Sequence, residues 1–131
     1  MDLLTQVKAH KYEQKSYKPG DFLIDEGLPG SKVYVLNEGE VSIEIDGTEI
    51  AKVDKPGSVF GEMSAIMGRS ANATVKVSTN SDFYIIDDLL TAIRQDPEIA
   101  ITILRGMVNR VEVMNRQQLE RNWWQYLFSS K

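Results

Sequence analysis

The chain has 131 residues, which is close to the size of one domain and enough to bury a hydrophobic core. Its composition, 42% hydrophobic and 26% charged, is ordinary for a globular protein, and the absence of cysteine excludes disulfides and thiolate metal sites. No apolar run approaches the length of a membrane span, and residues 1–5 lack the features of a signal peptide. We therefore expect a single domain over residues 1–131, in the reducing cytoplasm and without membrane association.

The net charge of −4, from 15 basic and 19 acidic side chains, is unevenly distributed. Residues 21–62 hold ten acids and three lysines, whereas residues 105–131 hold five basic residues and two acids. The body is therefore acidic and the tail mildly basic. Neither part has the concentrated basic face of a nucleic-acid binder, so direct binding to nucleic acid is not expected.

Residues 1–16 begin with Leu3, Leu4 and Val7 at helical spacing, which predicts a short amphipathic helix followed by an extended segment at 15–17. His10 is the only histidine of the chain. A metal site needs further ligands and finds neither a second histidine nor a cysteine, so we interpret His10 as a surface residue of this helix.

Residues 17–86 consist of short apolar segments separated by turns rich in glycine and proline. Residues 40–45 alternate polar and apolar side chains, and Asp46-Gly47 after them is a strong hairpin signal. The expected strands are 22–24, 32–36, 40–45, 48–53, 73–77 and 83–86. Many short strands at close, even spacing predict a β-sandwich or a small β-barrel.

Helical periodicity returns at residue 87 and continues to about 128. One short helix is expected over 87–94, and Asp96-Pro97-Glu98 marks the start of a long helix that reaches residue 119 or beyond. One face of this helix is expected to carry Ile101, Leu104, Met107, Val108, Val111, Met114 and Gln118. The stripe is only partly heptad-like, so it fits packing on the chain's own body at least as well as a dimer seam. The aromatic run over 123–128, with Trp123 and Trp124, would dock on the body, on a second subunit or on another protein.

The stretch 60–75, FGEMSAIMGRSANATV, contains the residues with the clearest potential for ligand binding. Gly61 predicts a tight turn into a short helix, whose first backbone N–H groups are a ready anion site. The carboxylate of Glu62 beside them suits a sugar hydroxyl. Arg69 and Ser70, a few residues later, would complete a phosphate clamp.

This stretch resembles the phosphate-binding cassette of the cyclic nucleotide-binding domain family, which includes the catabolite activator protein, protein kinase A regulatory subunits and cyclic-nucleotide-gated channels. The family pattern is Phe-Gly-Glu, a hydrophobic residue and Ala or Ser, then a loop, then Arg, a small residue and Ala-Thr-Val; the first half is matched residue for residue. The glycine-containing turns over 19–61 follow the family's order and approximate spacing. The resemblance covers about residues 15–118 and implies a mainly β fold with flanking α, a double-stranded β-helix (jelly-roll) barrel. The barrel is expected at about 17–86, with a short N-terminal helix, a cassette helix and C-terminal helices at 87–128.

Two alignments of the second half of the motif compete. Without a gap, the family's phosphate-binding arginine falls on Ala71 and its neighbour on Asn72, and the strand pattern after Asn72 favours this register. With a gap, Arg69-Ser70-Ala71 supplies the motif from a loop two residues shorter. The resemblance implies a ligand-binding set of Gly61, Glu62, Met63, Ser64, Arg69, Ser70, Ala71 and Asn72.

Two functions follow from the resemblance. One is a regulatory sensor that binds cyclic AMP or cyclic GMP and transmits through, or dimerises by, its C-terminal helix. The other is a degenerate domain that binds no nucleotide and serves as a protein interaction or dimerisation module. An enzyme of the cupin type would need clustered histidine and acid ligands, so we expect neither catalysis nor a cofactor.

Overall fold

The structure, a computed structural model, describes the backbone of residues 2–128 and the side chains of residues 2–113, 115 and 116. The strands are β1 (Glu13–Tyr17), β2 (Phe22–Ile24), β3 (Val33–Glu38), β4 (Val41–Ile45), β5 (Thr48–Val53), β6 (Val59–Phe60), β7 (Thr74–Val77) and β8 (Ser81–Ile86). The helices are α1 (Leu3–Ala9), α2 (Glu62–Met67), α3 (Leu89–Gln95) and α4 (Glu98–Phe128). Within the described residues, no helix combines the length and apolar character of a membrane span.

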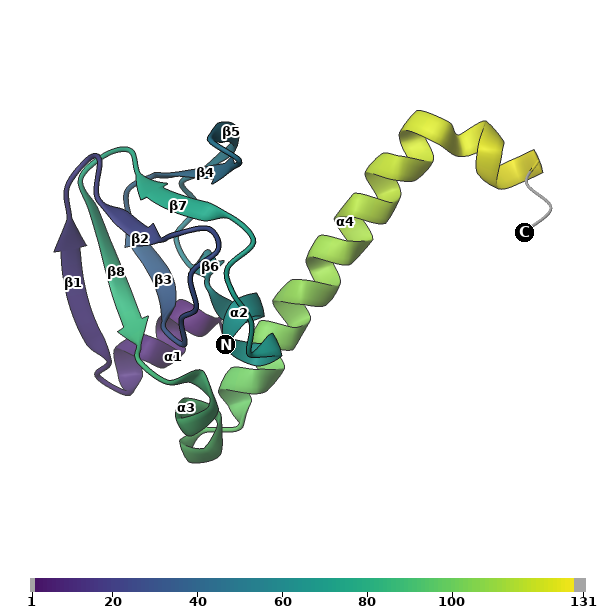
Figure 1. Cartoon of the computed structure of the whole chain (residues 1–131). Helices are drawn as coiled ribbons and strands as arrows, with labels where there is room; N and C mark the ends of the chain where they lie inside the picture. The colour runs from purple at the N-terminus through teal and green to yellow at the C-terminus, as the bar shows by residue number, and fades with distance from the viewer. Residues whose placement is uncertain (1, 129–131) are drawn as a thin grey trace.

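The strands form two four-stranded antiparallel sheets that face each other (Figure 1). We call the sheet with order β1-β8-β3-β6 sheet A and the sheet with order β2-β7-β4-β5 sheet B. The expected jelly-roll is confirmed, but the expected barrel is wrong in one respect, because the two sheets are not closed into one ladder. The short strands β2 and β6 explain this, since three and two residues provide too few backbone groups to continue the pairing around the corner.

The β4–β5 hairpin is confirmed where the sequence predicts it. Asp46 and Gly47 both have positive φ, 52° and 78°, which is the geometry of a type I′ turn. Ile45 pairs with Thr48 directly across this turn.

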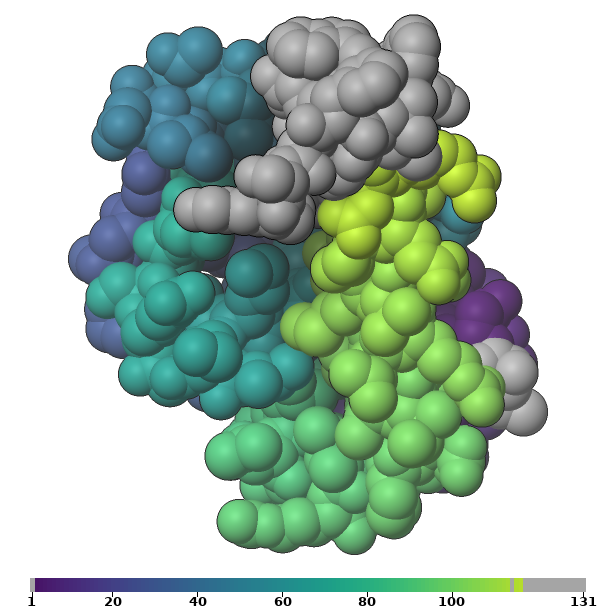
Figure 2. Space-filling model, turned by 90° about the vertical axis from the view of Figure 1, so that its right-hand side faces the viewer, coloured from purple at the N-terminus to yellow at the C-terminus, as the bar shows by residue number. Residues whose placement is uncertain are grey.

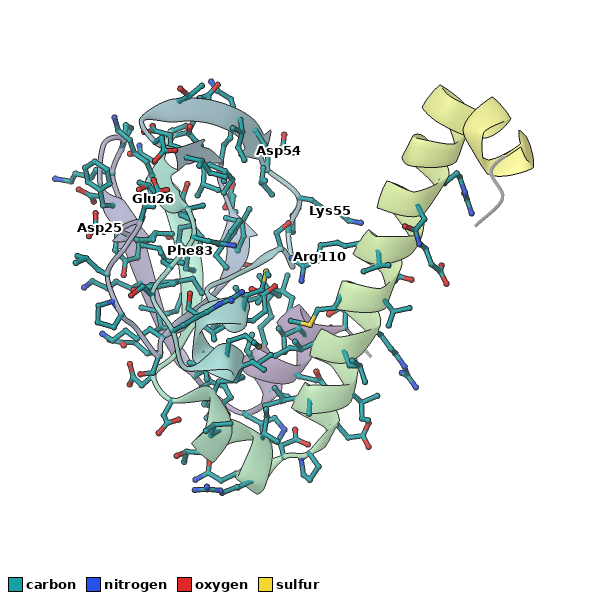
Figure 3. All side chains as sticks on the ribbon, turned by 45° about the vertical axis from the view of Figure 1, so that its right-hand side comes forward. Asp25, Glu26, Asp54, Lys55, Phe83 and Arg110 are labelled. Atoms are coloured by element: carbon teal, nitrogen blue, oxygen red, sulfur yellow. The ribbon has the colours of Figure 1, made fainter. Side chains whose placement is uncertain are left out.

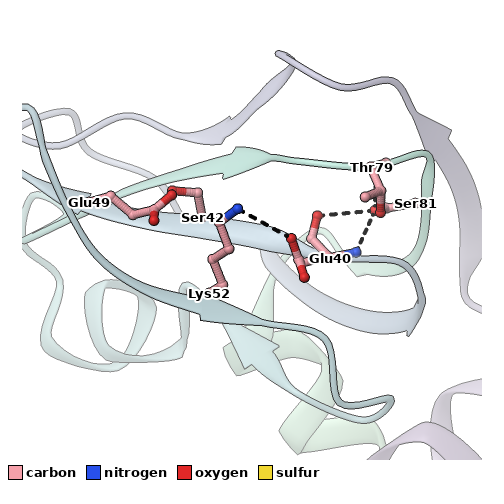
Figure 4. Close-up of polar contacts among 6 residues, drawn as sticks. All are labelled: Glu40, Ser42, Glu49, Lys52, Thr79 and Ser81. Atoms are coloured by element: carbon pink, nitrogen blue, oxygen red, sulfur yellow. Dashed lines mark hydrogen bonds and ion pairs between the residues drawn. The ribbon is translucent and has the colours of Figure 1, made fainter.

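Polar side chains connect β4, and the residue just before it, to β5 and to β8 (Figure 4). The Ser81 hydroxyl accepts from the backbone N–H of Glu40 and donates to the carbonyl of Thr79, while Lys52 lies 3.8 Å from the Glu40 carboxylate. The Ser42 hydroxyl donates to Glu49 across the hairpin at 2.7 Å. Ser81 thus connects β8 to the residue that precedes β4, while Glu49 and Lys52 connect β5 to β4 and to that same residue.

Two hydrophobic cores share strand β3. Tyr34 and Leu36 point between the sheets and pack around Phe83, whereas Val33 and Val35 point outward onto the helices. The outer core is completed by buried residues of α1, α3 and α4, namely Leu3, Val7, Leu89, Ala92, Ile99 and Ile103. Sheet A is therefore covered on both faces, which makes β3 a continuous apolar run rather than an alternating one.

The start signal expected at Asp96 is confirmed, and Asp2 caps the first helix in the same way. Asp2 caps α1 by accepting from the N–H of Thr5 at 2.8 Å, and Asp96 accepts from the N–H of Glu98 at the start of α4. The single apolar face expected on the long helix is wrong, because that helix carries two stripes. Ile99, Ile103 and Met107 pack on the body. A separate stripe, Ile101, Leu104, Val108 and Val111, is exposed. The aromatic run with Trp123 and Trp124, like Met114 and Gln118, lies outside the described side chains.

Candidate functional site

A pocket of about 260 Å³ lies between sheet B, the cassette and α4. Its apolar wall comes from every strand of sheet B, through Ile24, Val75, Ile43 and Val53. The cassette contributes the opposite wall, and one residue of α4 contributes the edge. In the space-filling view, the atoms of α2 and of the first half of α4 lie side by side (Figure 2).

Gly61 sets the start of the cassette helix. Its φ is +93°, and a Cβ there would lie 2.6 Å from the carbonyl oxygen of Lys32, a backbone atom that cannot move aside. Only glycine therefore fits between β6 and α2. The carbonyl of Gly61 accepts from the N–H of Ala65, which closes the first turn of α2 and fixes Glu62 at its first position.

The carboxylate of Glu62 is paired with Arg110 of α4. The Arg110 Nη2 lies 2.5 Å from the Glu62 Oε1, and the side chain of Glu62 is 4% exposed whereas that of Arg110 is 54% exposed. Arg110 extends from α4 toward the body of the molecule (Figure 3). A buried carboxylate needs such a partner, because an uncompensated buried charge is strongly destabilising. The contact joins the cassette to α4 through two residues that are 48 positions apart in the sequence.

The sequence led us to expect a sugar hydroxyl at Glu62, and the pairing of Glu62 with Arg110 was not predicted. One signal was available. Ile99, Ile103 and Met107 recur at helical spacing on the body-facing side of α4, and Arg110 continues that series three residues later. A basic residue that follows an apolar stripe at this spacing lies on the same side of the helix, and there it can pair with a buried acid of the body.

The cassette loop places Ala71, not Arg69, in the wall of the pocket. Ala71 is buried, its N–H donates to the carbonyl of Leu28 at 3.0 Å, and its carbonyl accepts from the N–H of Gly27 at 2.8 Å. Arg69 and Ser70 are exposed, and neither lines this pocket. In the ungapped register, Ala71 would stand at the position of the family's arginine, and the wall of the pocket would carry a methyl group there.

The remaining candidates are close to the same pocket. Met63, Ser64 and Asn72 line it, and Ser64 is half-buried. Ser64, Gly61 and Ala71 also line an adjoining hollow of about 400 Å³, which includes Tyr34. Burial raises the pKa of Tyr34, so its hydroxyl stays protonated at neutral pH. Six of the eight predicted site residues thus gather around one region, and Arg69 and Ser70 remain outside it.

The charges at the pocket are few. Glu62 and Arg110 are its only ionisable lining residues in the described part of the chain, and they neutralise each other. No group of three metal-ligating side chains occurs among the described residues. The arrangement can hold a small molecule with a flat apolar part against sheet B and a hydroxyl-bearing part at Glu62.

Comparison with known proteins gives a consistent result. Residues 14–96 match the family described as the cyclic nucleotide-binding domain. Among curated relatives, the cyclic nucleotide-gated channel beta-3 of Canis lupus familiaris is 40% identical over 73 residues, 54% of this chain and 9% of the channel. The chain therefore spans less than a tenth of the length of that relative.

Solved structures give the same fold. A cyclic nucleotide-binding domain from Methylobacillus flagellatus has a TM-score of 0.71 at 22% identity and covers 93% of this chain and 72% of its own. The cAMP-bound PfPKA-R fragment has a TM-score of 0.67 at 25% identity, over 90% of this chain and 42% of its own. The regulatory subunit of a cAMP-independent protein kinase A from Trypanosoma cruzi, bound to guanosine, has a TM-score of 0.57 at 23% identity, over 64% of this chain and 30% of its own.

Proposed function

The chain belongs to the cyclic nucleotide-binding domain family, and from this premise we propose that it is a regulatory domain whose pocket binds a ribose-bearing ligand and whose helix α4 responds to that ligand. Domains of this family are regulatory rather than catalytic. The ligand would lie with its base on the apolar wall of sheet B and its ribose at Glu62. Cyclic AMP and cyclic GMP are the first candidates, because PfPKA-R, one of the structural neighbours, is bound to cAMP.

One observation carries this proposal, the contact between Glu62 and Arg110. Glu62 would accept the hydrogen bond from a ribose hydroxyl, and the same carboxylate accepts the hydrogen bond from Arg110 of α4. A ligand that hydrogen bonds to Glu62 changes the environment of the ion pair, so binding and the position of α4 are linked. Arg110 is thus the residue through which α4 would respond to a ligand in the pocket.

The test is calorimetric titration of the purified chain with cyclic AMP, cyclic GMP, adenosine and guanosine, after any bound nucleotide has been removed. We expect at least one of them to bind at micromolar concentration. Glu62→Gln should weaken this binding about tenfold or more, because a charge-assisted hydrogen bond to the ribose is lost. Glu13→Gln, an exposed acid on β1, is the matched control and should leave the affinity unchanged.

The absence of heat and of any thermal shift with all four ligands at millimolar concentration would contradict the proposal. Circular dichroism of Glu62→Gln before titration separates lost binding from lost folding. The response of α4 is measured by hydrogen exchange around Arg110, where an unchanged pattern at saturating ligand would remove the link between pocket and helix.

A second function, assembly through α4, is favoured by the exposed stripe of Ile101, Leu104, Val108 and Val111. Their spacing of three, four and three residues places them at alternating a and d positions. β-branched residues at a, leucine at the first d and exposed Asn115 at the next a are typical of a parallel two-stranded coiled coil. We expect a second copy of this chain to cover the stripe.

Sedimentation equilibrium tests this dimer. The wild-type chain should sediment as a dimer at micromolar concentration, and Leu104→Glu as a monomer. Ile50→Glu on β5 is the matched control, since Ile50 and Leu104 are both 57% exposed, and it should remain a dimer. A wild-type chain that is monomeric at tens of micromolar would contradict this assignment.

A further inference from the structure

We infer that the pocket selects an uncharged nucleoside with a free ribose diol over the corresponding cyclic nucleotide. The inference rests on the proposed function, because it names the ligand class of the same pocket. Three observations carry it: the pairing of Glu62, the burial of Ala71 and the places of the remaining cations.

The pocket has no cation to spare for a phosphate. Arg110 is its only basic lining residue in the described part of the chain, and it is already hydrogen bonded to Glu62. A cyclic phosphate would have to take Arg110 away from Glu62. The carboxylate, which is almost fully buried, would then be charged and without its partner, and this penalty opposes the gain from the phosphate contact.

The other nearby cations do not replace Arg110. Lys32 lines the adjoining hollow together with Asp25, and its Nζ lies 3.9 Å from the carboxylate of Asp87. Arg69 is exposed and contributes to neither hollow. Ala71 presents only a methyl group and a backbone that is already hydrogen bonded to the loop at Gly27 and Leu28. A phosphate in this pocket would therefore meet no uncommitted positive side chain.

An uncharged nucleoside needs no cation, and Glu62 can accept hydrogen bonds from it without losing Arg110. Arg110 donates to Oε1 of Glu62, and Oε2 accepts no hydrogen bond from any residue that the structure describes. A ribose with free 2′ and 3′ hydroxyls offers two O–H donors to this carboxylate. A 3′,5′-cyclic phosphate has consumed the 3′ hydroxyl and offers only one. The nucleoside thus hydrogen bonds to Glu62 while the ion pair with Arg110 stays intact, and its base packs on Ile43, Val53 and Val75.

The test compares guanosine and adenosine with cyclic GMP and cyclic AMP by calorimetric titration of the full chain. We expect the better nucleoside to bind at least tenfold more tightly than either cyclic nucleotide, and its 2′,3′-dideoxy form to lose most of that affinity. Ala71→Arg restores a cation at the wall and should reverse the order. Lys55→Gln removes an exposed cation outside the pocket lining and should leave the order unchanged.

A measurement on the wild-type chain keeps the inference testable if Ala71→Arg does not fold. Nucleoside affinity should be the same at 50 mM and 500 mM salt, because no phosphate contact is screened. Cyclic nucleotides that bind as tightly as the nucleosides, or more tightly, would overturn the inference and leave the proposed function standing. Failure of all four ligands to bind would remove the proposed function itself, and the inference with it.

Discussion

The two sheets of this domain differ in how their faces are covered. Sheet A is covered by sheet B on one side and by α1, α3 and α4 on the other, so Val33, Val35, Leu36 and Phe83 are completely buried. Sheet B is covered on one side only, and most of β5 is exposed. All four strands of sheet B contribute one apolar side chain to the wall of the pocket, and of these four side chains only that of Val75 is buried.

This difference separates the part of the molecule that maintains the fold from the part that a ligand would complete. Substitutions in sheet A should lower the free energy of unfolding whether or not a ligand is present. Substitutions around the pocket should act more strongly on binding. The cassette lies on the boundary, because Phe60 belongs to the inner core and Gly61 to the pocket.

The largest expected effect is at the centre of sheet A. The Phe83 ring is fully buried, and its centroid lies 5.7 Å from that of Tyr17 and 6.3 Å from those of Tyr34 and Phe60. Phe83→Ala should lower the free energy of unfolding by about 4 kcal/mol, since it removes a large apolar side chain and leaves a cavity. Phe22→Ala is the same substitution on sheet B, where Phe22 is 54% exposed, and should cost less than about 1 kcal/mol. Urea unfolding of both variants measures the difference, and equal losses would contradict the contrast between the sheets.

A smaller effect is expected at the boundary. Gly61→Ala places a Cβ against the backbone carbonyl of Lys32 and in a left-handed conformation, and should cost about 2–3 kcal/mol. Gly68→Ala is the control, because Gly68 has φ +64° but no atom within 4 Å of the added Cβ, so only the conformational cost of about 1 kcal/mol remains. Thermal unfolding of the two variants isolates the contribution of the Lys32 contact. Equal losses would show that the backbone relaxes away from the added methyl group.

The sequence allowed most of the strands and the helix starts to be predicted, because these depend on local signals. Asp46-Gly47 determines its own turn, and Asp96-Pro97-Glu98 determines where α4 begins. The division into two sheets instead of a barrel depends on how many residues at the corners continue to pair, which periodicity does not reveal. The expected face of α4 grouped Met107 with the exposed residues and omitted Ile99 and Ile103, because 3.6-residue spacing alone does not say which side of the helix the body covers.

The candidate site was predicted only in part. The cassette from Gly61 to Asn72 is continuous in sequence, so its position in the chain was visible. The ion pair joins Glu62 to Arg110, which follows it by 48 residues, and it depends on where α4 meets the cassette in the packed molecule. The charge balance of the pocket depends on that contact. The ligand class depends on the same charge balance, which is why the sequence alone left it open.

The smallest expected effect concerns pH and again separates the sheets, because β1, β3 and β8 carry tyrosines and the strands of sheet B carry none. Burial, and then the charge of Tyr34, raises the pKa of Tyr17 above its usual value near 10.0. A raised pKa in the folded state means that the stability contribution is fully present below pH 10 and is lost as the pH rises through the pKa of the folded state. Tyr17→Phe removes this titration but keeps the ring against Phe83, so its stability should fall less steeply above pH 10 than that of the wild type. Urea unfolding of both proteins at intervals from pH 8 to pH 11.5 measures the two slopes. Parallel curves would mean that the Tyr17 hydroxyl is as well solvated in the folded chain as in the unfolded one, and that this edge of sheet A is as open as sheet B.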